Sequence, residues 1–232
     1  MALDGPRLPP ARGEATHLAV LVHGYGADGN DLIGLAPHFQ RALPTTAFVA
    51  PNAPTRLSDR RGYQWFSFSQ PNQMEMQKGV ASAAPILDAF LDEELARLRL
   101  GRDRLMLIGF SQGTMLSLAV GLTRPCAAIV GYSGTLTGTK TLPALDCETP
   151  PILLIHGDSD SAIPVTALFY SANALALAGA RVQWHISQGI GHTIAPDGLA
   201  LGVNFLSLAA RGQLAVTGTV HCPMTDAKRA PA

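Results

Sequence analysis

Six short apolar runs constrain the fold of this chain more than any other feature of its sequence. Most of them lack the polar alternation of a strand with one face in water, which is typical of strands buried on both faces of a parallel sheet. Longer segments of helical periodicity separate them. The six runs, each predicted as a strand, are LAVLV (18–22), AFVA (47–50), RLMLIGF (104–110), AAIVGY (127–132), PILLIH (151–156) and RVQWHI (181–186).

Helices are predicted between these runs. The strongest pattern is a stripe of apolar residues at helical spacing, with charged residues beside it. Because proline disrupts a helix interior but is tolerated in the first turn, we expect this helix to begin near Ser82, with Pro85 in its first turn. Further helices are predicted near 112–123, 165–178 and 197–210. The stripe consists of Val80, Ala84, Leu87, Leu91, Leu95 and Leu98.

The alternation of strands and helices predicts an α/β fold with a mostly parallel central sheet and helices on both faces. A length of 232 residues and a hydrophobic content of 47% are compatible with one domain that has a sizeable core. No internal repeat, charge run or linker divides the chain. We expect an N-terminal extension or edge strand over 1–17, the α/β domain over 18–210, and a C-terminal tail over 211–232 that is loose rather than an added edge strand.

The charge balance and the cysteines argue against several function classes. Seventeen basic and seventeen acidic residues give a formal net charge of zero, so no bulk field attracts nucleic acid or an anionic membrane, and a small neutral partner is expected. Cys126, Cys147 and Cys222 have no C-x-x-C spacing and predict neither a disulfide framework nor a zinc site.

No stretch approaches the roughly 20 apolar residues of a spanning helix. With no signal-peptide pattern at the start, a cytoplasmic protein without stable membrane insertion is expected.

The motif that carries chemistry is GFSQG at residues 109–113, at the end of a predicted strand and before a helical segment. G-x-S-x-G in this setting is typical of a nucleophile elbow, a turn so sharp that only small flanking residues fit. Gly109 and Gly113 meet that need, and Ser111 would lie near a helix N-terminus, where backbone N–H groups favour negative charge. The alternative is a glycine-flanked turn in which Ser111 only caps the helix.

A nucleophilic serine needs a base and an acid that orients the base, and on such a fold they follow in the order serine, acid, histidine. Of seven histidines, His192 stands in the glycine-rich loop SQGIGHTIAPDG between the last strand and the last helix, which makes it the predicted base. The acid is expected in HGDSD, at the carboxyl edge of the sheet. Sequence alone leaves Asp158 and Asp160 as alternatives, and either could instead stabilise a turn.

Donors for the oxyanion are expected in LVHGYGADGNDL (21–32), after the first apolar run. Its glycines allow backbone N–H groups to point inward, and the N–H groups of Tyr25 and Gln112 are the predicted pair. The three glycines of GYGADG also match the outline G-x-G-x-x-G of a nucleotide-binding loop. That outline is weak by itself and no Walker lysine follows. Since the serine-acid-histidine order accounts for more residues, we reject a nucleotide site.

Five motifs in unbroken order resemble the phospholipase/carboxylesterase family of α/β-hydrolases, which includes acyl-protein thioesterases and bacterial carboxylesterases. The likeness extends from about Leu18 to Leu208 and implies the α/β-hydrolase fold. It also implies that Ser111 is the nucleophile, that His192 is the base, and that Asp160, the second aspartate of H-G-x-x-D, is the acid. The motifs are LVHGYGADGNDL, GYQWFSF, GFSQGTM, HGDSDSAIP and GIGHTIAPDG.

The resemblance says less about the substrate pocket. Ile-Pro at 163–164 replaces the commoner Val-Pro of the family, and the loop 67–79 has no close match. The resemblance implies that Trp65 and Phe66 lie near the acyl pocket, with Ile163 as a further substrate-binding residue. Core packing of the two aromatic side chains is the alternative.

Hydrolysis of a carboxylic ester or thioester through an acyl-enzyme is the predicted function, and it requires no cofactor and no metal. The segment 135–149 is too short for a large cap domain, so an open site for short to medium acyl chains is expected. Similar proteins often pair, so a homodimer is compatible with the sequence. The alternatives are lactone hydrolysis or acyl transfer by the same three residues, and a non-catalytic binding module on the same fold.

Overall fold

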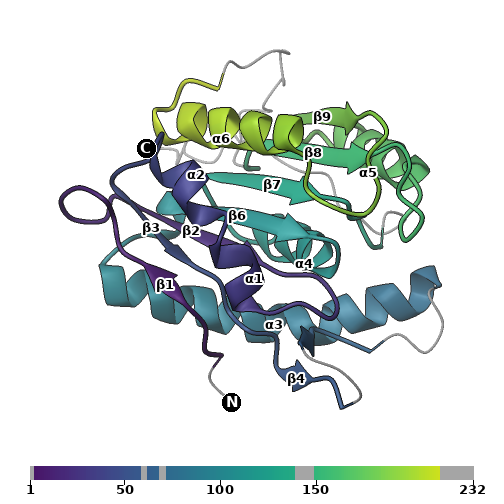
Figure 1. The fold of residues 1–232 in the computed structure, drawn as a ribbon, viewed down its shortest axis with the longest axis horizontal. Helices are drawn as coiled ribbons and strands as arrows, with labels where there is room; N and C mark the ends of the chain where they lie inside the picture. Colours follow the sequence, from purple (N-terminus) through teal and green to yellow (C-terminus); the bar gives the residue numbers. More distant parts are fainter. Residues whose placement is uncertain (1–2, 59–61, 68–71, 139–148, 215–232) are drawn as a thin grey trace, which may run out of the picture.

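A seven-stranded sheet forms the centre of the protein, in the order β1-β3-β2-β6-β7-β8-β9 (Figure 1). The computed structural model describes residues 3–58, 62–67, 72–138 and 149–214. Neighbouring strands pair in parallel except β1, which runs antiparallel to β3 at one edge. The strands are β1 (Arg7–Leu8), β2 (His17–Val22), β3 (Thr46–Val49), β6 (Leu105–Phe110), β7 (Ala128–Tyr132), β8 (Ile152–Gly157) and β9 (Val182–Ser187).

The predicted α/β fold is confirmed: all six predicted strands form, each displaced by no more than one residue at either end. Helices cover both faces of the sheet because successive strand residues point to opposite sides. In β2, Leu18 and Val20 belong to the core layer shared with α3, α4 and α5, whereas Ala19 and Leu21 belong to the layer shared with α1, α2 and α6. The helices are α1 (Gly29–Ile33), α2 (Ala36–Gln40), α3 (Gln73–Leu98), α4 (Gln112–Gly121), α5 (Thr166–Leu177) and α6 (Pro196–Ala210), with a 3₁₀ turn at Arg102–Arg104 and a small antiparallel pair, β4 (Thr55–Arg56) and β5 (Tyr63–Gln64).

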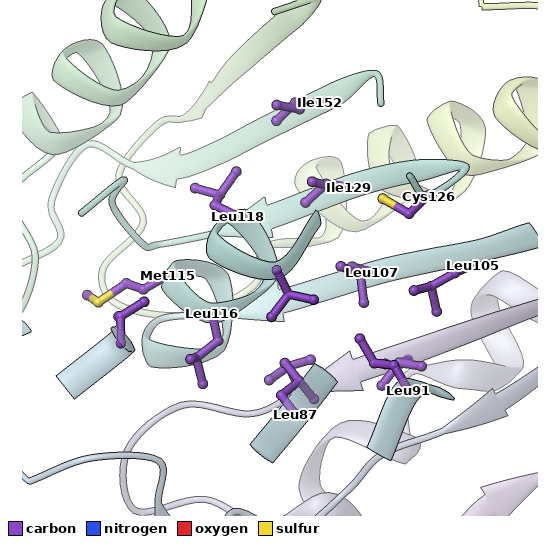
Figure 2. Packing of buried hydrophobic residues seen from close by; sticks show 14 of the residues in the cluster. Leu87, Leu91, Leu105, Leu107, Met115, Leu116, Leu118, Cys126, Ile129 and Ile152 are labelled. Carbon is purple, nitrogen blue, oxygen red and sulfur yellow. The ribbon is translucent and has the colours of Figure 1, made fainter. Parts of the chain in front are cut away.

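The layer between α3, α4 and β6 fixes the position of α4 on the sheet (Figure 2). Leu87 and Leu91 of α3 pack here with Leu116 of α4 and with Leu105 and Leu107 of β6, and all five side chains are fully buried. Burying a leucine side chain contributes about 1.5–3 kcal/mol. This packing therefore holds both elements that flank the turn between β6 and α4.

The prediction for α3 was wrong at its N-terminus. The helix begins at Gln73 rather than near Ser82, and Pro85 lies in its interior. Asn72 caps it by accepting a hydrogen bond from a backbone N–H of the first turn. Pro85 removes the helical bond to the carbonyl of Ala81, at a cost of about 3 kcal/mol. Because both residues are exposed, water can satisfy that carbonyl, and the side chains that α3 buries outweigh the loss.

The close approach of α4 to the end of β2 depends on Gly113, where an added Cβ would collide with the carbonyl of Val22. Gly113→Ala is expected to lower the free energy of unfolding by about 3 kcal/mol, as overpacking of a rigid core does. Gly34→Ala is the matched control, because Gly34 has a φ of −58° and the nearest atom to its added Cβ is 3.7 Å away. We expect that change to be neutral or to stabilise by up to about 1 kcal/mol. Urea unfolding measures the change in the free energy of unfolding for both variants. Equal changes would contradict the close approach of α4 to β2.

Some predictions concern residues outside those described. These are Cys147, Cys222, residues 215–232 of the tail, residues 139–148 of the segment predicted to be too short for a cap, and residues 68–71 of the loop 67–79. Cys126 is buried. Among the helices of the described ranges, none is long and apolar enough to cross a bilayer.

Candidate active site

Ser111 occupies the turn between β6 and α4 in a strained backbone conformation. Its φ of 54° and ψ of −116° are unusual for a residue with a side chain, and such conformations cost about 1–3 kcal/mol and cluster at functional sites. The N–H of Ser111 donates to the carbonyl of Tyr132 at 2.9 Å, which ties the turn to β7. Gly109 is required beside it, because an added Cβ would lie 2.5 Å from the backbone of Thr114. The sequence motif therefore has the geometry of a nucleophile elbow.

Asp160 and His192, which are far apart in the sequence, form a direct hydrogen bond. The Nδ1–H of His192 donates to Oδ2 of Asp160 at 2.7 Å, a length typical of a charge-assisted bond. The side chain of Asp160 is completely buried, and that of His192 is one-quarter exposed. Because Nδ1 faces the carboxylate, the second ring nitrogen, Nε2, is the one available to a reacting hydroxyl.

The carboxylate of Asp160 is held in its charged form. Burial by itself would raise the pKa of Asp160, but the hydrogen bonds from the N–H of Ile163, from His192 and from the N–H of Ala162 lower the pKa below its ordinary value. Its Oδ1 accepts from the two N–H groups at 2.9 and 2.8 Å, which leaves Oδ2 for His192. A buried carboxylate with this set of donors is suited to orient an imidazole and to stabilise its protonated form.

Asp158, the alternative acid from the sequence, lies elsewhere in the same loop. Its Oδ1 accepts from the N–H of Gly189 at 2.7 Å and from the hydroxyl of Ser159 at 3.0 Å. The residue is exposed. Asp158 therefore stabilises the turn, and it is Asp160 that contacts the histidine.

Ser111 and His192 line one cavity of about 600 Å³ at the carboxyl ends of β6 and β8, where the arrowheads in Figure 1 point. The ring of His192 packs against Phe110, the residue before the serine, with centroids 4.9 Å apart. Ile163 lines the same cavity. Further apolar lining comes from α3, α4, α5 and the segment after β7, and includes Met76, Met115, Leu136, Ala167 and Tyr170.

The segment expected to supply an oxyanion donor packs directly against the serine. An added Cβ at Gly24 would lie only 3.0 Å from Cβ of Ser111, and Tyr25 lines the cavity. Gln112 follows the serine as the first residue of α4 and is fully buried. The structure therefore places the segment that leads into Tyr25 against Ser111, and Gln112 directly after it.

His23 orients the peptide group between Gly24 and Tyr25, a role that sequence reasoning missed. Its Nε2 lies 3.0 Å from the N–H of Ala53 and must accept, so Nδ1 carries the proton and donates to the carbonyl of Gly24 at 2.7 Å. In a trans peptide the N–H of Tyr25 points opposite to that carbonyl. Burial lowers the pKa of His23, in keeping with a neutral ring. The only signal in the sequence is a histidine that ends a buried strand before a glycine.

Trp65 and Phe66 lie in the core beside the site. The indole N–H of Trp65 donates to the carbonyl of His23 at 2.9 Å, and its backbone N–H donates to Oε1 of Gln112 at 3.1 Å. Nε2 of Gln112 donates to the carbonyl of Phe66 at 2.9 Å. Both side chains are buried, and among the described residues neither lines the cavity of Ser111.

The described residues offer no metal centre: no group of three or more His, Cys, Asp or Glu side chains within them is arranged to hold an ion. The groups gathered at this site include the hydroxyl of Ser111 and the imidazole of His192, which line the cavity, and the carboxylate of Asp160, which is bonded to the imidazole. Such a set can transfer an acyl group through a covalent intermediate.

Comparison with known proteins identifies the family of the chain. The model of the Phospholipase/Carboxylesterase family matches residues 4–210. Acyl-protein thioesterase 1 of Gibberella zeae is 27% identical over 214 residues, which cover 84% of this chain and 91% of that protein. Acyl-protein thioesterase 1 of Schizosaccharomyces pombe is 31% identical over 172 residues, which cover 69% and 75% of the two chains.

Solved structures show the same architecture. The crystal structure of esterase PE8 is 42% identical, with a TM-score of 0.84 over 89% of this chain and 98% of that one. Acyl-protein thioesterase 2 of Zea mays, at 22% identity, shares the fold with a TM-score of 0.72 over 89% and 99% of the two chains. The family match includes the elbow, the acid loop and the histidine loop. The chain therefore belongs to the phospholipase/carboxylesterase family of α/β-hydrolases and is a hydrolase of the esterase and thioesterase class.

Proposed function

We propose that Ser111, His192 and Asp160 form a catalytic triad that hydrolyses carboxylic esters or thioesters of short to medium acyl chains. The observation that carries the proposal is the 2.7 Å bond between Asp160 and His192, because it holds the imidazole at a cavity that Ser111 also lines. The strained turn at Ser111 and the neighbouring helix N-terminus support the role of nucleophile.

The reaction begins when Oγ of Ser111 attacks the carbonyl carbon while Nε2 of His192 takes its proton. Asp160 holds the proton of the other ring nitrogen and stabilises the imidazolium. The bond to the leaving oxygen or sulfur then breaks, and the leaving group takes the proton from Nε2. Water repeats the sequence on the acyl-enzyme: Nε2 accepts its proton, the acid departs, and Ser111 regains its hydrogen.

The N–H groups of Tyr25 and Gln112 stabilise the negative oxygen of each tetrahedral intermediate. Donors that are oriented before the reaction begins lower the barrier without further reorganisation, and losing one typically costs about a hundredfold or more in kcat. The bond from His23 to the carbonyl of Gly24 supports such orientation for Tyr25. The buried side chain of Gln112, bonded to Trp65 and Phe66, supports it for the start of α4.

The cavity favours an apolar acyl group of limited length. Its volume of about 600 Å³ is typical of small-molecule sites. Aliphatic and aromatic side chains, with those of methionine and proline, supply most of its lining. Relatives named acyl-protein thioesterase and esterase support oxygen and sulfur leaving groups alike.

A panel of p-nitrophenyl esters from acetate to palmitate, with matching acyl thioesters, tests this proposal. We expect kcat/KM to be highest between butyrate and octanoate and about tenfold lower for palmitate, since chain atoms outside the cavity gain no burial. Maximal activity on palmitate would contradict the limit on chain length. Added alcohol acceptors distinguish acyl transfer from hydrolysis, and absence of any turnover would favour a binding module.

The proposal retains a cytoplasmic setting, the absence of nucleic-acid partners and of stable membrane insertion, and a homodimer as expectations. The formal net charge of zero supports a small neutral substrate rather than a polyanion. Sedimentation at several protein concentrations distinguishes a monomer from a dimer.

A further inference from the structure

His156 is a buried ionisable side chain that the proposed reaction does not use. It lies near the end of β8, and only 1% of its surface is exposed. Its Nε2 is 2.8 Å from the carbonyl oxygen of Ile163 and 3.4 Å from Oδ2 of Asp160. The latter is the same oxygen that accepts from His192. His156 therefore lies close to the same oxygen of the proposed acid that bonds the base.

The hydrogen bond to Ile163 has only one possible direction. A carbonyl oxygen can only accept, so Nε2 of His156 carries a proton and donates it. The distance of 2.8 Å makes this the main bond of the ring, whereas 3.4 Å to Oδ2 is a longer contact with a charge. His156 therefore acts on Asp160 chiefly through Ile163.

Ile163 links the two side chains because both ends of its peptide backbone are engaged. Its N–H donates to Oδ1 of Asp160 at 2.8 Å, and its carbonyl accepts from His156. With Oδ1 also bonded to the N–H of Ala162, the carboxylate cannot rotate without breaking these bonds. Oδ2 is thereby kept toward His192.

The loop that carries His192 is fixed against the same end of β8. The N–H of Ser159 donates to the carbonyl of Ile190 at 3.0 Å. An added Cβ at Gly157 would collide with that carbonyl, so the two loops approach as closely as a glycine allows. Small movements of the 160–163 turn are therefore transmitted directly to the distance between Asp160 and His192.

We propose that His156 is a positioning residue that fixes the 160–163 turn through Ile163 and so holds Asp160 in line with His192. This role rests on the proposed triad. A second function follows for Ile163, whose backbone orients the acid while its side chain lines the cavity. An apolar residue at 156 would also leave the carbonyl of Ile163 without this donor.

His156→Gln and His156→Asn form a matched pair that tests the proposal. The amide nitrogen of glutamine reaches as far from the backbone as Nε2, whereas that of asparagine reaches only as far as Nδ1. We expect His156→Asn to lower kcat/KM for p-nitrophenyl butyrate about tenfold to a hundredfold, as a small misplacement of a catalytic group does. His156→Gln is expected to restore most of the activity, within about threefold of the original, because it keeps the donor.

Both substitutions are then repeated in the Asp160→Asn background. If His156 acts through the acid, His156→Asn costs less than about twofold there, since residues that act as one unit are not additive. A full loss in that background, or equal losses for asparagine and glutamine, overturns the positioning role. Should His156→Asn fail to fold, ¹⁵N NMR of the original protein decides: a proton on Nε2 of His156 is expected, and a neutral ring protonated on Nδ1 contradicts the proposal.

The same assays separate this inference from the triad itself. If Ser111→Ala and Asp160→Asn abolish turnover while His156→Asn has no effect, only the positioning role fails. If Ser111→Ala keeps full activity, the triad fails, and the role of His156 fails with it.

Discussion

Ser111→Ala is expected to lower kcat for p-nitrophenyl butyrate by about 10⁴- to 10⁶-fold while the protein stays folded. The loss is this large because the hydroxyl is the group that forms the acyl-enzyme. A methyl group at this position removes one oxygen and leaves the packing of the turn unchanged. Steady-state kinetics, together with an unfolding curve to confirm the native state, measures the effect.

Ser133→Ala is the matched control, because Ser133 directly follows β7 of the same sheet, is buried and also has a positive φ, of 45°. Its N–H donates to the carbonyl of Ile155, and the substitution leaves that bond intact. We expect kcat to change by less than about threefold, as is usual away from the reacting atoms. Similar losses in the two variants would mean that strain in the turns, rather than the Ser111 hydroxyl, governs turnover.

Asp160→Asn is expected to lower kcat about 10⁴-fold at neutral pH. The N–H groups of Ala162 and Ile163 can only donate, so the amide oxygen must take the place of Oδ1. The amide NH₂ then faces Nδ1 of His192 and donates to it. The ring proton is forced onto Nε2, and the imidazole can no longer accept the proton of the serine.

Asp158→Asn provides the control two residues away. Asparagine keeps the oxygen that accepts from Gly189 and from Ser159, so the turn is preserved. We expect kcat within about twofold of the original and a small change in stability. If Asp158→Asn were the inactive variant and Asp160→Asn the active one, the assignment of the acid would be wrong.

The strands were predictable because their apolar runs are unbroken, and a buried parallel sheet requires that pattern. The start of α3 was not predictable, because the helix accommodates Pro85 in its interior only where that residue is exposed. For 1–17 the sequence left an extension and an edge strand as alternatives, because β1 has only two residues and no periodicity; its pairing with Phe48 and Val49 makes it an edge strand. Local sequence patterns thus predict the elements that are buried because their residues are apolar. They do not predict an element whose conformation depends on its contacts with other parts of the fold.

The candidate active site was likewise predictable only in part. The elbow motif fixes Ser111, because the backbone turn requires glycines at set positions. Asp158 and Asp160 could not be distinguished from their local sequence, because only the N–H groups of the folded turn direct Asp160 inward. The cavity lining was not predictable either, since Met115 and Tyr170 come from different helices. Only the folded chain brings such residues together.

Covalent labelling tests the central claim most directly, namely that three separated side chains meet to make Ser111 a nucleophile. The protein is incubated with a fluorophosphonate, digested, and its modified peptide is identified by mass spectrometry. We predict one adduct, on Ser111, formed much more slowly in Asp160→Asn and unchanged in rate in Asp158→Asn. A fully active protein that remains unlabelled at Ser111, or that carries the adduct on another residue, would contradict the account.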